Sequence, residues 1–334
     1  MSELTVESLR GNVPESRHRV SVAVVNAAGH LERYSGDPRF MTFMRSAAKP
    51  FQALPVIESG AAESFGFSDA EVALACASHS SEPQQVQAVS ALLARIGCVE
   101  ADLACGAHRP LSADLALPAP ARDASSGPAV PRTPLASNCS GKHTAMLALA
   151  RHCGWPTSGY ERADHPVQGR CRESVLRWTG VREDHLAEGV DGCGVVAFAV
   201  PLQAMAFAYA RLGVSAEPAA RRVVAAMTGH PHLVAGARRP CSALMSAYQG
   251  RVLAKVGAEG VYGAALPDRG LGIAVKVESG HTWAAVVALI AVLDALELEP
   301  RPSAALLTYA APGVFNTRGL QVGSLRASGG LAGA

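Results

Sequence analysis

The chain has 334 residues, of which 49% are apolar and 17% are charged. This composition excludes an intrinsically disordered protein, and the length predicts one or two domains with substantial cores. The formal net charge of +2 is too small to indicate a nucleic-acid partner.

The first predicted element is a β-hairpin near the start of the chain. Apolar residues alternate from Val20 to Asn26, and a second short run from His30 to Tyr34 follows a turn that contains Gly29. A series of helical patterns comes next, with cap residues at Ser46 and Ser68. These helices are predicted at residues 46–57, 68–75, 82–96, 141–152, 165–179, 201–212 and 218–228, and a long loop rich in proline, alanine and serine at 109–134.

The last third of the chain changes character. Short apolar runs are separated by glycine, proline and aspartate, which predicts consecutive antiparallel strands at 251–256, 260–266 and 271–277. One apolar helix is predicted after them, at 281–296. The element order indicates an α/β (α+β) fold, in which one antiparallel sheet is built from both chain ends, flanked by helices and interrupted by a mostly helical insertion.

This order also predicts how the chain divides into domains. We expect an α/β sheet domain from residues 1–60 and 235–334 and a mostly helical domain from residues 61–234. An active-site cleft is expected between the two domains, because clefts at domain interfaces are common sites for small ligands.

The start of the chain and its cysteines indicate a compartment. The first twenty residues mix acidic and basic side chains without an apolar segment, so no secretory signal is expected. The eight irregularly spaced cysteines then indicate reduced thiols or metal ligands. The uncharged run from Gly192 to Ala210 contains Pro201 and Gln203, which favours a buried element over a membrane span. We expect a soluble, cytoplasmic protein, and a membrane protein is the alternative.

Only four of the 30 lysine and arginine residues are lysines, namely Lys49, Lys142, Lys255 and Lys276. Arginine fills nearly every other basic position, so these lysines are candidates for roles that a guanidinium cannot serve. Unlike arginine, lysine can lose its proton near neutral pH and act as a base or a ligand. Codon bias with chance survivors is the alternative explanation.

Two of these lysines lie in motifs that are typical of serine hydrolases. Ser46 and Lys49 form a Ser-x-x-Lys motif at the start of a predicted helix, where a spacing of three places them near enough to form a hydrogen bond. A neutral lysine can take the serine proton and make the hydroxyl nucleophilic. Lys255-Val256-Gly257 closes a predicted strand, as Lys-Thr-Gly or Lys-Ser-Gly does in β-lactamases and penicillin-binding proteins, although Val256 replaces the hydroxyl residue. A surface serine cap with a solvated lysine is the alternative.

Two further segments carry candidate site residues. Ser78 lies between two predicted helices and suits an oxyanion or proton-shuttle role, whereas the serines after it are expected to be helix caps. Gly141-Lys142 is not a phosphate loop, because His143 stands where serine or threonine belongs. Cys139 and Cys193 lie near glycines and could hold a thiophilic ion, with two buried structural cysteines as the alternative.

Six motifs resemble those of the asparaginase II family of the Rhizobium etli type. In chain order they are MRSAAKPFQ, CASHSSEP, SNCSGKHTAML, HPVQ, DGCG and AKVGAEG, and the resemblance extends from about Val20 to Arg326. It implies hydrolysis of L-asparagine to L-aspartate and ammonia by a homodimer. It also implies a fold related to serine β-lactamases, penicillin-binding proteins and glutaminases.

The resemblance further implies which residues form the site. The implied catalytic residues are two serine–lysine pairs in one cleft: Ser46, Lys49, Ser78 and Lys255. The implied ligands of a zinc ion are Cys139, Lys142 and Cys193. The implied substrate contacts are Asp191, Asn138, His143 and Cys241. The segment from Arg239 to Ser242 departs from the family pattern and could alter the pocket near Cys241.

The expected reaction is acyl transfer. Ser46, deprotonated by Lys49, would attack the side-chain amide carbon of asparagine, with Lys255 and Ser78 stabilising charge or relaying a proton to ammonia. Water would then hydrolyse the aspartyl-enzyme, and zinc would orient the substrate or shape the pocket. The alternatives are a β-lactamase-like serine hydrolase or a glutaminase acting on another amide or ester, and a non-catalytic zinc-binding protein.

Overall fold

The computed structural model describes residues 3–108, 132–298 and 304–334. Within these ranges, the largest element is a nine-stranded sheet whose main path runs β10-β11-β1-β2-β9-β8-β7, while β3 pairs with β2 and β12. The strands of this sheet are β1 (Thr5–Arg10), β2 (Val13–Asn26), β3 (Leu31–Ser35), β7 (Leu253–Val256), β8 (Val261–Leu266), β9 (Leu271–Val277), β10 (Gly313–Phe315), β11 (Gln321–Ser328) and β12 (Ala332–Gly333).

This sheet joins the two ends of the chain. β2 pairs antiparallel with β9, with Val22 opposite Val275, and antiparallel with β3 on its other side. β7, β8 and β9 form a continuous antiparallel ladder. The end of β2, from Val20 to Val25, is buried on both faces because helices pack against it. The predicted hairpin, the three C-terminal strands and the single antiparallel sheet from both chain ends are therefore confirmed.

The uncharged run after Asp191 folds as a strand and a helix. It forms β6 (Val196–Pro201) and most of α8 (Leu202–Val214), which lies against β2, β8 and β9. A side chain at Gly272 would collide with the backbone of Ala206, so glycine permits this close approach of helix and sheet. Among the described residues, no helix is long and apolar enough to cross a bilayer. The interpretation of this run as a buried element is confirmed.

A smaller sheet, which the sequence did not predict, holds two segments of the site beside each other. In the described part of the chain it has three strands in the order β4-β6-β5, with β4 at Met41–Phe43 and β5 at Ala187–Val190. β4 leads into the turn that carries Ser46, and β5 leads into the loop that carries Asp191. The outer strands are short and expose apolar side chains, so they lack a clear alternating pattern.

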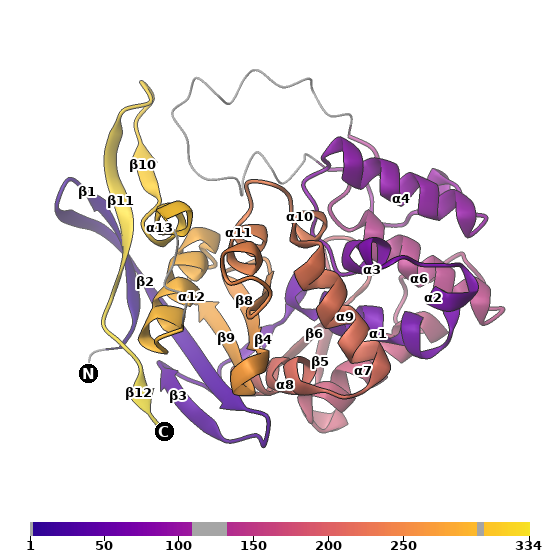
Figure 1. Cartoon of the computed structure of the whole chain (residues 1–334), viewed down its shortest axis with the longest axis horizontal. Helices are drawn as coiled ribbons and strands as arrows, with labels where there is room; N and C mark the ends of the chain where they lie inside the picture. The colour runs from indigo at the N-terminus through magenta and orange to yellow at the C-terminus, as the bar shows by residue number, and fades with distance from the viewer. Residues whose placement is uncertain (1–2, 109–131, 299–303) are drawn as a thin grey trace.

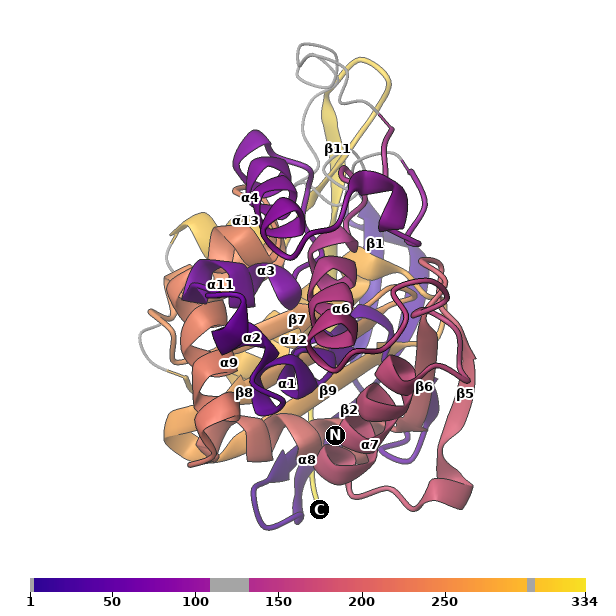
Figure 2. The ribbon, with the colours of Figure 1, turned by 90° about the vertical axis from the view of Figure 1, so that its right-hand side faces the viewer.

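Most of the helices gather on one side of the molecule, on the right in Figure 1. These helices are α1 (Lys49–Glu58), α2 (Ala61–Ser64), α3 (Asp69–Ala75), α4 (Pro83–Arg95), α6 (Ser140–His152), α7 (Pro166–Thr179) and α9 (Pro218–Gly229). Figure 2, viewed from that side, shows α1, α6 and α7 in front of the strands. The predicted helices are confirmed, whereas the loop predicted at 109–134 falls mostly outside the described residues.

Two predictions of helix caps were wrong. Ser46 lies in a 3-10 turn before α1, and the cap of α4 is Glu82, because the hydroxyls of Ser80 and Ser81 donate to backbone carbonyls of other segments.

The remaining helices connect this side to the sheet. α10 (Pro231–Val234) contacts α11 (Pro240–Ala247), and α11 packs against β7. α12 (Thr282–Ala295) is the predicted apolar helix and packs against β1, β8, β9 and β11, with α13 (Ala304–Ala310) beside it. The division of the chain into a sheet domain and a helical domain stays a prediction.

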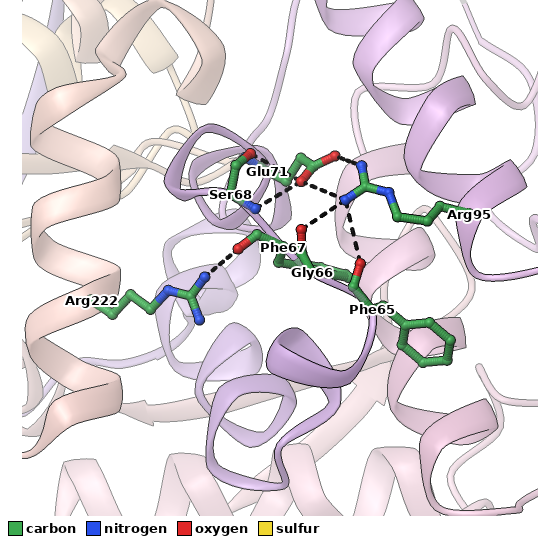
Figure 3. Close-up of polar contacts among 7 residues, drawn as sticks. All are labelled: Phe65, Gly66, Phe67, Ser68, Glu71, Arg95 and Arg222. Carbon is green, nitrogen blue, oxygen red and sulfur yellow. Dashed lines mark hydrogen bonds and ion pairs between the residues drawn. The ribbon is translucent and has the colours of Figure 1, made fainter.

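A polar cluster fixes the start of α3, the helix that precedes Ser78 (Figure 3). The backbone N–H and the hydroxyl of Ser68 donate to Glu71 Oε2 at 2.8 and 2.9 Å, which caps the helix. Arg95 of α4 forms an ion pair with Glu71 and donates to two carbonyl oxygens of the preceding turn, and Arg222 of α9 donates to a third. Two neighbouring helices, α4 and α9, therefore hold the start of the element that delivers Ser78.

Candidate active site

A cavity of about 460 Å³ lies where these elements meet. It is bordered by the turn before α1, the loop after α3, the start of α6, the loop after β5 and the end of β7. The predicted site residues on its wall are Ser46, Ser78, Asn138, Cys139, Asp191 and Cys193. The structure therefore brings together motifs that are far apart in the sequence.

Ser78 lines this cavity and lies between two buried lysines. Lys49 Nζ and Lys255 Nζ each donate to Ser78 Oγ at a distance of 2.9 Å. Lys49 also donates to the carbonyl oxygen of Ala77 at 2.6 Å, and Lys255 to that of Val256 at 2.8 Å. Both lysines are fully buried. The Ser78 hydroxyl is thus within proton-transfer distance of two amines at once.

The surroundings give these two lysines different properties. Burial lowers the pKa of Lys255 to about 7, with the charges of Lys49 and Arg239 acting in the same direction and Cys241 opposing them. At neutral pH, much of Lys255 is therefore an uncharged amine with a free lone pair. Lys49 instead has acceptors for all three N–H groups of its ammonium form, since the carbonyl oxygen of Asn138 also lies 3.5 Å from Nζ.

Ser46 reaches the cavity from a strained turn. It lies in the 3-10 turn Arg45–Ala48, where Arg45 has a φ of 50°, in the left-handed region that residues other than glycine seldom adopt. Ser46 is half-buried, and its hydroxyl has no hydrogen-bond partner among the described residues. The expected hydrogen bond between Ser46 and Lys49 is not formed, because Lys49 begins α1 and its Nζ reaches Ser78 instead.

Two of the predicted metal ligands, Cys139 and Cys193, line the cavity, and the third, Lys142, is buried beside them. Cys139 and Cys193 are hydrogen-bonded to each other, and Lys142 Nζ donates to Cys193 Sγ at 3.1 Å. The hydrogen bond from Cys193 lowers the pKa of the Cys139 thiol, and the charges of Lys49 and Lys142 lower it further. Burial opposes the charged form of Lys142, but the two thiols outweigh burial and raise the pKa of its amine.

These three side chains fit a thiophilic cation in kind and in proximity. Two thiols and an amine are donors that zinc accepts, and both cysteines are residues of the cavity wall. Among the residues that the structure describes, no group of three or more histidine, cysteine, aspartate or glutamate side chains could hold a metal ion. A metal at this site would therefore need the lysine amine in its neutral form as the third donor.

Asp191 faces the cavity beside the strained turn. Its Oδ1 accepts a hydrogen bond from Arg45 Nε at 2.9 Å, in an ion pair whose side chains are 11% and 25% exposed respectively. Burial opposes ionisation of Asp191, but the charges of Lys142 and Arg45 outweigh burial and lower the pKa of the carboxyl. A largely enclosed carboxylate is thus available to a cationic group in the cavity.

Of three further residues predicted to contact the substrate, one lines the cavity and two are buried behind its wall. Asn138 is on the cavity wall, where its side-chain oxygen lies 2.7 Å from His108 Nε2. His143 is fully buried away from the wall, and its Nδ1 lies 2.6 Å from the hydroxyl of Tyr160. Cys241 is also fully buried, with its sulfur 3.0 Å from the hydroxyl of Tyr262. The cavity wall does not include His143 or Cys241.

Sequence reasoning missed several residues that the structure adds to the wall. Arg45, His108 and Arg239 all line the cavity. Arginine is common throughout this chain, so neither arginine stood out from its neighbours. Arg239 lies in a segment that departs from the family pattern, which was the only sequence signal for it. Its burial and its position depend on tertiary packing.

The chain is similar to known proteins in structure and to a known family in sequence. No curated protein matches the chain. A protein named Mglu, in its native form, has a TM-score of 0.48 and 16% sequence identity, covering 86% of this chain and 66% of that chain. Mglu in the presence of 4.3 M NaCl has a TM-score of 0.49 and 16% identity, covering 86% of this chain and 63% of that one. This chain thus spans slightly less than two thirds of the length of these Mglu chains.

A third solved structure and a family model complete the comparison. A β-lactamase from Mycobacterium bovis has a TM-score of 0.31 and 15% identity, covering 87% of this chain and 95% of that chain. The model of the L-asparaginase II family matches residues 6–327, nearly the whole chain. This match confirms the resemblance that the six sequence motifs indicated. The protein therefore belongs to the L-asparaginase II family.

Proposed function

We propose that the protein is an amidohydrolase that converts L-asparagine and water to L-aspartate and ammonia through an acyl-enzyme. Membership of the L-asparaginase II family supports hydrolysis of an amide. The observation that carries the proposal is the position of Ser78, whose hydroxyl lies 2.9 Å from two buried lysine amines in a cavity that Ser46 also lines. This arrangement supplies a nucleophile, a base and a fixed positive charge in one enclosed space.

Ser46 is proposed as the nucleophile and Ser78 as the group that carries its proton. The Ser46 hydroxyl is free of hydrogen bonds within the described chain and is more exposed than Ser78, which is 3% exposed and held by both lysines. A hydroxyl held between two amines can receive a proton on one side and release it on the other. A serine on a strained turn at the wall of a cavity is also typical of hydrolase nucleophiles.

The proposed acylation begins when Ser46 Oγ forms a bond to the side-chain amide carbon. The hydroxyl proton passes through Ser78 Oγ to the neutral amine of Lys255. The carbon–nitrogen bond then breaks, and the same path returns the proton to the departing nitrogen, which leaves as ammonia. The fixed charge of Lys49 stabilises the negative charge that develops on the oxygen atoms during these steps.

The proposed deacylation uses the same groups in reverse. Water attacks the ester carbon and gives a proton to Lys255, the bond from carbon to Ser46 Oγ breaks, and the serine recovers its proton. Asp191 is proposed to bind the ammonium group of the substrate, since it is an enclosed carboxylate at the wall. Its ion pair with Arg45 would then be shared or exchanged when the substrate enters.

We also propose a zinc ion held by Cys139, Cys193 and Lys142. When bound, it would place a fixed positive charge at this wall and orient the substrate. The chain's own contribution is to bring two thiols and an amine into mutual contact from α6 and the loop after β5.

The test is ammonia release by the purified protein from L-asparagine and L-glutamine, compared with hydrolysis of nitrocefin and short esters. Ser46→Ala is expected to lower kcat by about 10⁴-fold, and Ser78→Ala by about 10²-fold to 10⁴-fold. Ser64→Ala, at an exposed serine on α2, is the matched control and should leave kcat unchanged.

Mass spectrometry after rapid quenching should find one aspartyl group on Ser46. Full ammonia release by Ser46→Ala, or an aspartyl group on Ser78 instead, would show that the nucleophile has been assigned wrongly. Turnover of nitrocefin, esters or glutamine without turnover of asparagine would overturn the proposed substrate and favour another serine hydrolase or a glutaminase.

A further inference from the structure

Arg239 is a buried arginine on the cavity wall whose hydrogen-bonding capacity is only partly used. The residue is 1% exposed and lines the cavity. Its Nη1 donates to Ser80 Oγ at 3.0 Å, and that hydroxyl in turn donates to the carbonyl oxygen of Ala235. Its Nε and Nη2 have no hydrogen-bond partner within the part of the chain that the structure describes.

No carboxylate of the described residues forms an ion pair with this guanidinium. Glu82 is close enough to act on its charge, but Oε1 of Glu82 accepts a hydrogen bond from the backbone of Ala237 instead. A guanidinium stays charged at any physiological pH, so its charge remains after burial. Burying a charge with unused donors costs free energy, so such a group calls for an explanation, and a role in binding or catalysis is one.

The two unused nitrogen atoms lie on the same edge of the guanidinium group. The N–H groups of Nε and Nη2 point in the same direction, and together they match the two oxygen atoms of a carboxylate. We propose that Arg239 binds a carboxylate group of the substrate through this free edge, and so selects substrates that carry a carboxylate besides the amide to be hydrolysed.

The other lysine and arginine side chains at or beside the cavity have partners within the described residues. Arg45 is paired with Asp191, and Lys49 and Lys255 are engaged with Ser78. Arg239 therefore offers the free cationic edge, while Asp191 offers the anionic group. One anionic and one cationic contact at separate positions match the ammonium and carboxylate groups of an amino acid. This inference rests on the proposed function and adds to it the residue that recognises the carboxylate.

The test compares two substrates that differ only in this group, namely L-asparagine and L-asparagine α-amide, in which the carboxylate is replaced by a carboxamide. Arg239→Met is expected to lower kcat/KM for L-asparagine by about a hundredfold, chiefly through KM, and to leave the α-amide nearly unchanged. Arg239→Lys keeps the positive charge but lacks the two parallel N–H groups of the guanidinium. It should therefore recover only part of the loss in kcat/KM for L-asparagine. Arg238→Met, at the exposed neighbouring arginine, is the control and should behave as the wild type.

An equal loss for both substrates, with KM unchanged, would overturn the proposal, because it would mean that Arg239 stabilises the reacting oxygen instead. Unfolding of Arg239→Met is monitored by its melting temperature. Arg239→Lys supplies the same comparison between the two substrates if the methionine variant does not fold.

A binding measurement separates this inference from the proposed function. Calorimetric titration with succinate, which carries carboxylates and no scissile amide, should show binding to the wild type and at least about tenfold weaker binding to both Arg239 variants. If asparagine is not hydrolysed but succinate binds in an Arg239-dependent way, the proposed reaction fails and the carboxylate site stands. Equal succinate binding by wild type and both variants would overturn the carboxylate site whatever the enzyme hydrolyses.

Discussion

Two buried lysines that contact different residues of the cavity wall, Lys255 at Ser78 and Lys142 at Cys193, have opposite electrostatic surroundings. Lys255 lies among other cations, and burial lowers its pKa to about 7. Lys142 is as deeply buried but contacts thiols and lies near Asp191, and these groups raise the pKa of its amine. Burial alone therefore does not decide whether a lysine is charged, because the neighbouring groups determine which form is favoured.

The largest effect is expected from removing Lys255, the proposed base, because this removes one side of the contrast between the two lysines. Lys255→Met is expected to lower kcat for asparagine by about 10²-fold to 10⁴-fold, because general acid–base catalysis typically contributes that much. Ammonia release under saturating substrate measures it. Lys255→Arg keeps a cation that cannot lose its proton, so it should be as inactive as the methionine variant. An active arginine variant would mean that this position supplies charge and not proton transfer.

The proposed metal site at Cys139 and Cys193 is tested by replacing each sulfur atom in turn. Cys139→Ser and Cys193→Ser are each expected to lose stoichiometric zinc, measured by elemental analysis of the purified protein, and to lower kcat/KM by about tenfold to a hundredfold. Cys153→Ser, at an exposed cysteine, is the control and should retain both metal and activity. Wild-type protein purified without zinc and fully active would contradict the proposed metal site.

The pH dependence of activity and of stability tests whether Lys255 is uncharged in the folded protein, in contrast to Lys142. The activity kcat/KM should fall about tenfold per pH unit below pH 7, because the amine is then protonated and cannot act as a base. The folded-state pKa of about 7 lies below the value of about 10.4 for an unfolded chain, so the unfolded state binds more protons between them. The contribution of Lys255 to stability should therefore rise from pH 7 to about pH 10.4.

Chemical denaturation at several pH values measures this contribution. Lys255→Met should lack that part of the rise in the free energy of unfolding with pH. If the pH dependence of unfolding is the same in wild type and variant, the lysine is charged in the folded protein and the low pKa is wrong.

The smallest effect is expected from a change at the start of α3, the helix that precedes Ser78, because this change does not alter the reacting groups. Arg95→Met removes the ion pair with the largely buried Glu71 and should lower the free energy of unfolding by about 1 kcal/mol. Thermal unfolding measures this, with Arg162→Met as the control at a fully exposed ion pair, where no measurable change is expected. If the activation free energy calculated from kcat rises by more than the free energy of unfolding falls, α3 positions Ser78 more directly than the cap alone implies.

Much of the fold follows from local sequence patterns. Alternating apolar residues and glycine turns identified the hairpin of β2 and β3 and the ladder of β7 to β9, because buried strands and tight turns have distinct compositions. Seven strands were missed, namely β1, β4, β5, β6, β10, β11 and β12. β5 is short and exposed, and β6 lies in a continuous apolar run that resembles a helix or a membrane span. Periodicity alone cannot separate a short buried strand from a helix.

The sequence predicted which residues belong to the candidate site better than it predicted the contacts between them. The motifs identified the serines, lysines and cysteines that the structure brings together, but the spacing of Ser46 and Lys49 predicted a hydrogen bond that is not formed. Lys49 reaches Ser78 because the loop after α3 passes over the start of α1, which is a tertiary arrangement. Arg239 could not be assigned for the same reason, since its unused donors are apparent only once its surroundings are known.

The pairing of β2 with β9 has a consequence for when this chemistry can arise. Lys255 Nζ and Ser78 Oγ are in contact although their residues are 177 positions apart, and within the sheet β7 is joined to β2 through β8 and β9. A growing chain that has been synthesised as far as β6 already carries both serines and Lys49, but not the proposed base. The proposed site is therefore complete only after the C-terminal strands have been synthesised and added to the sheet, so the proposed reaction depends on folding of the nearly complete chain.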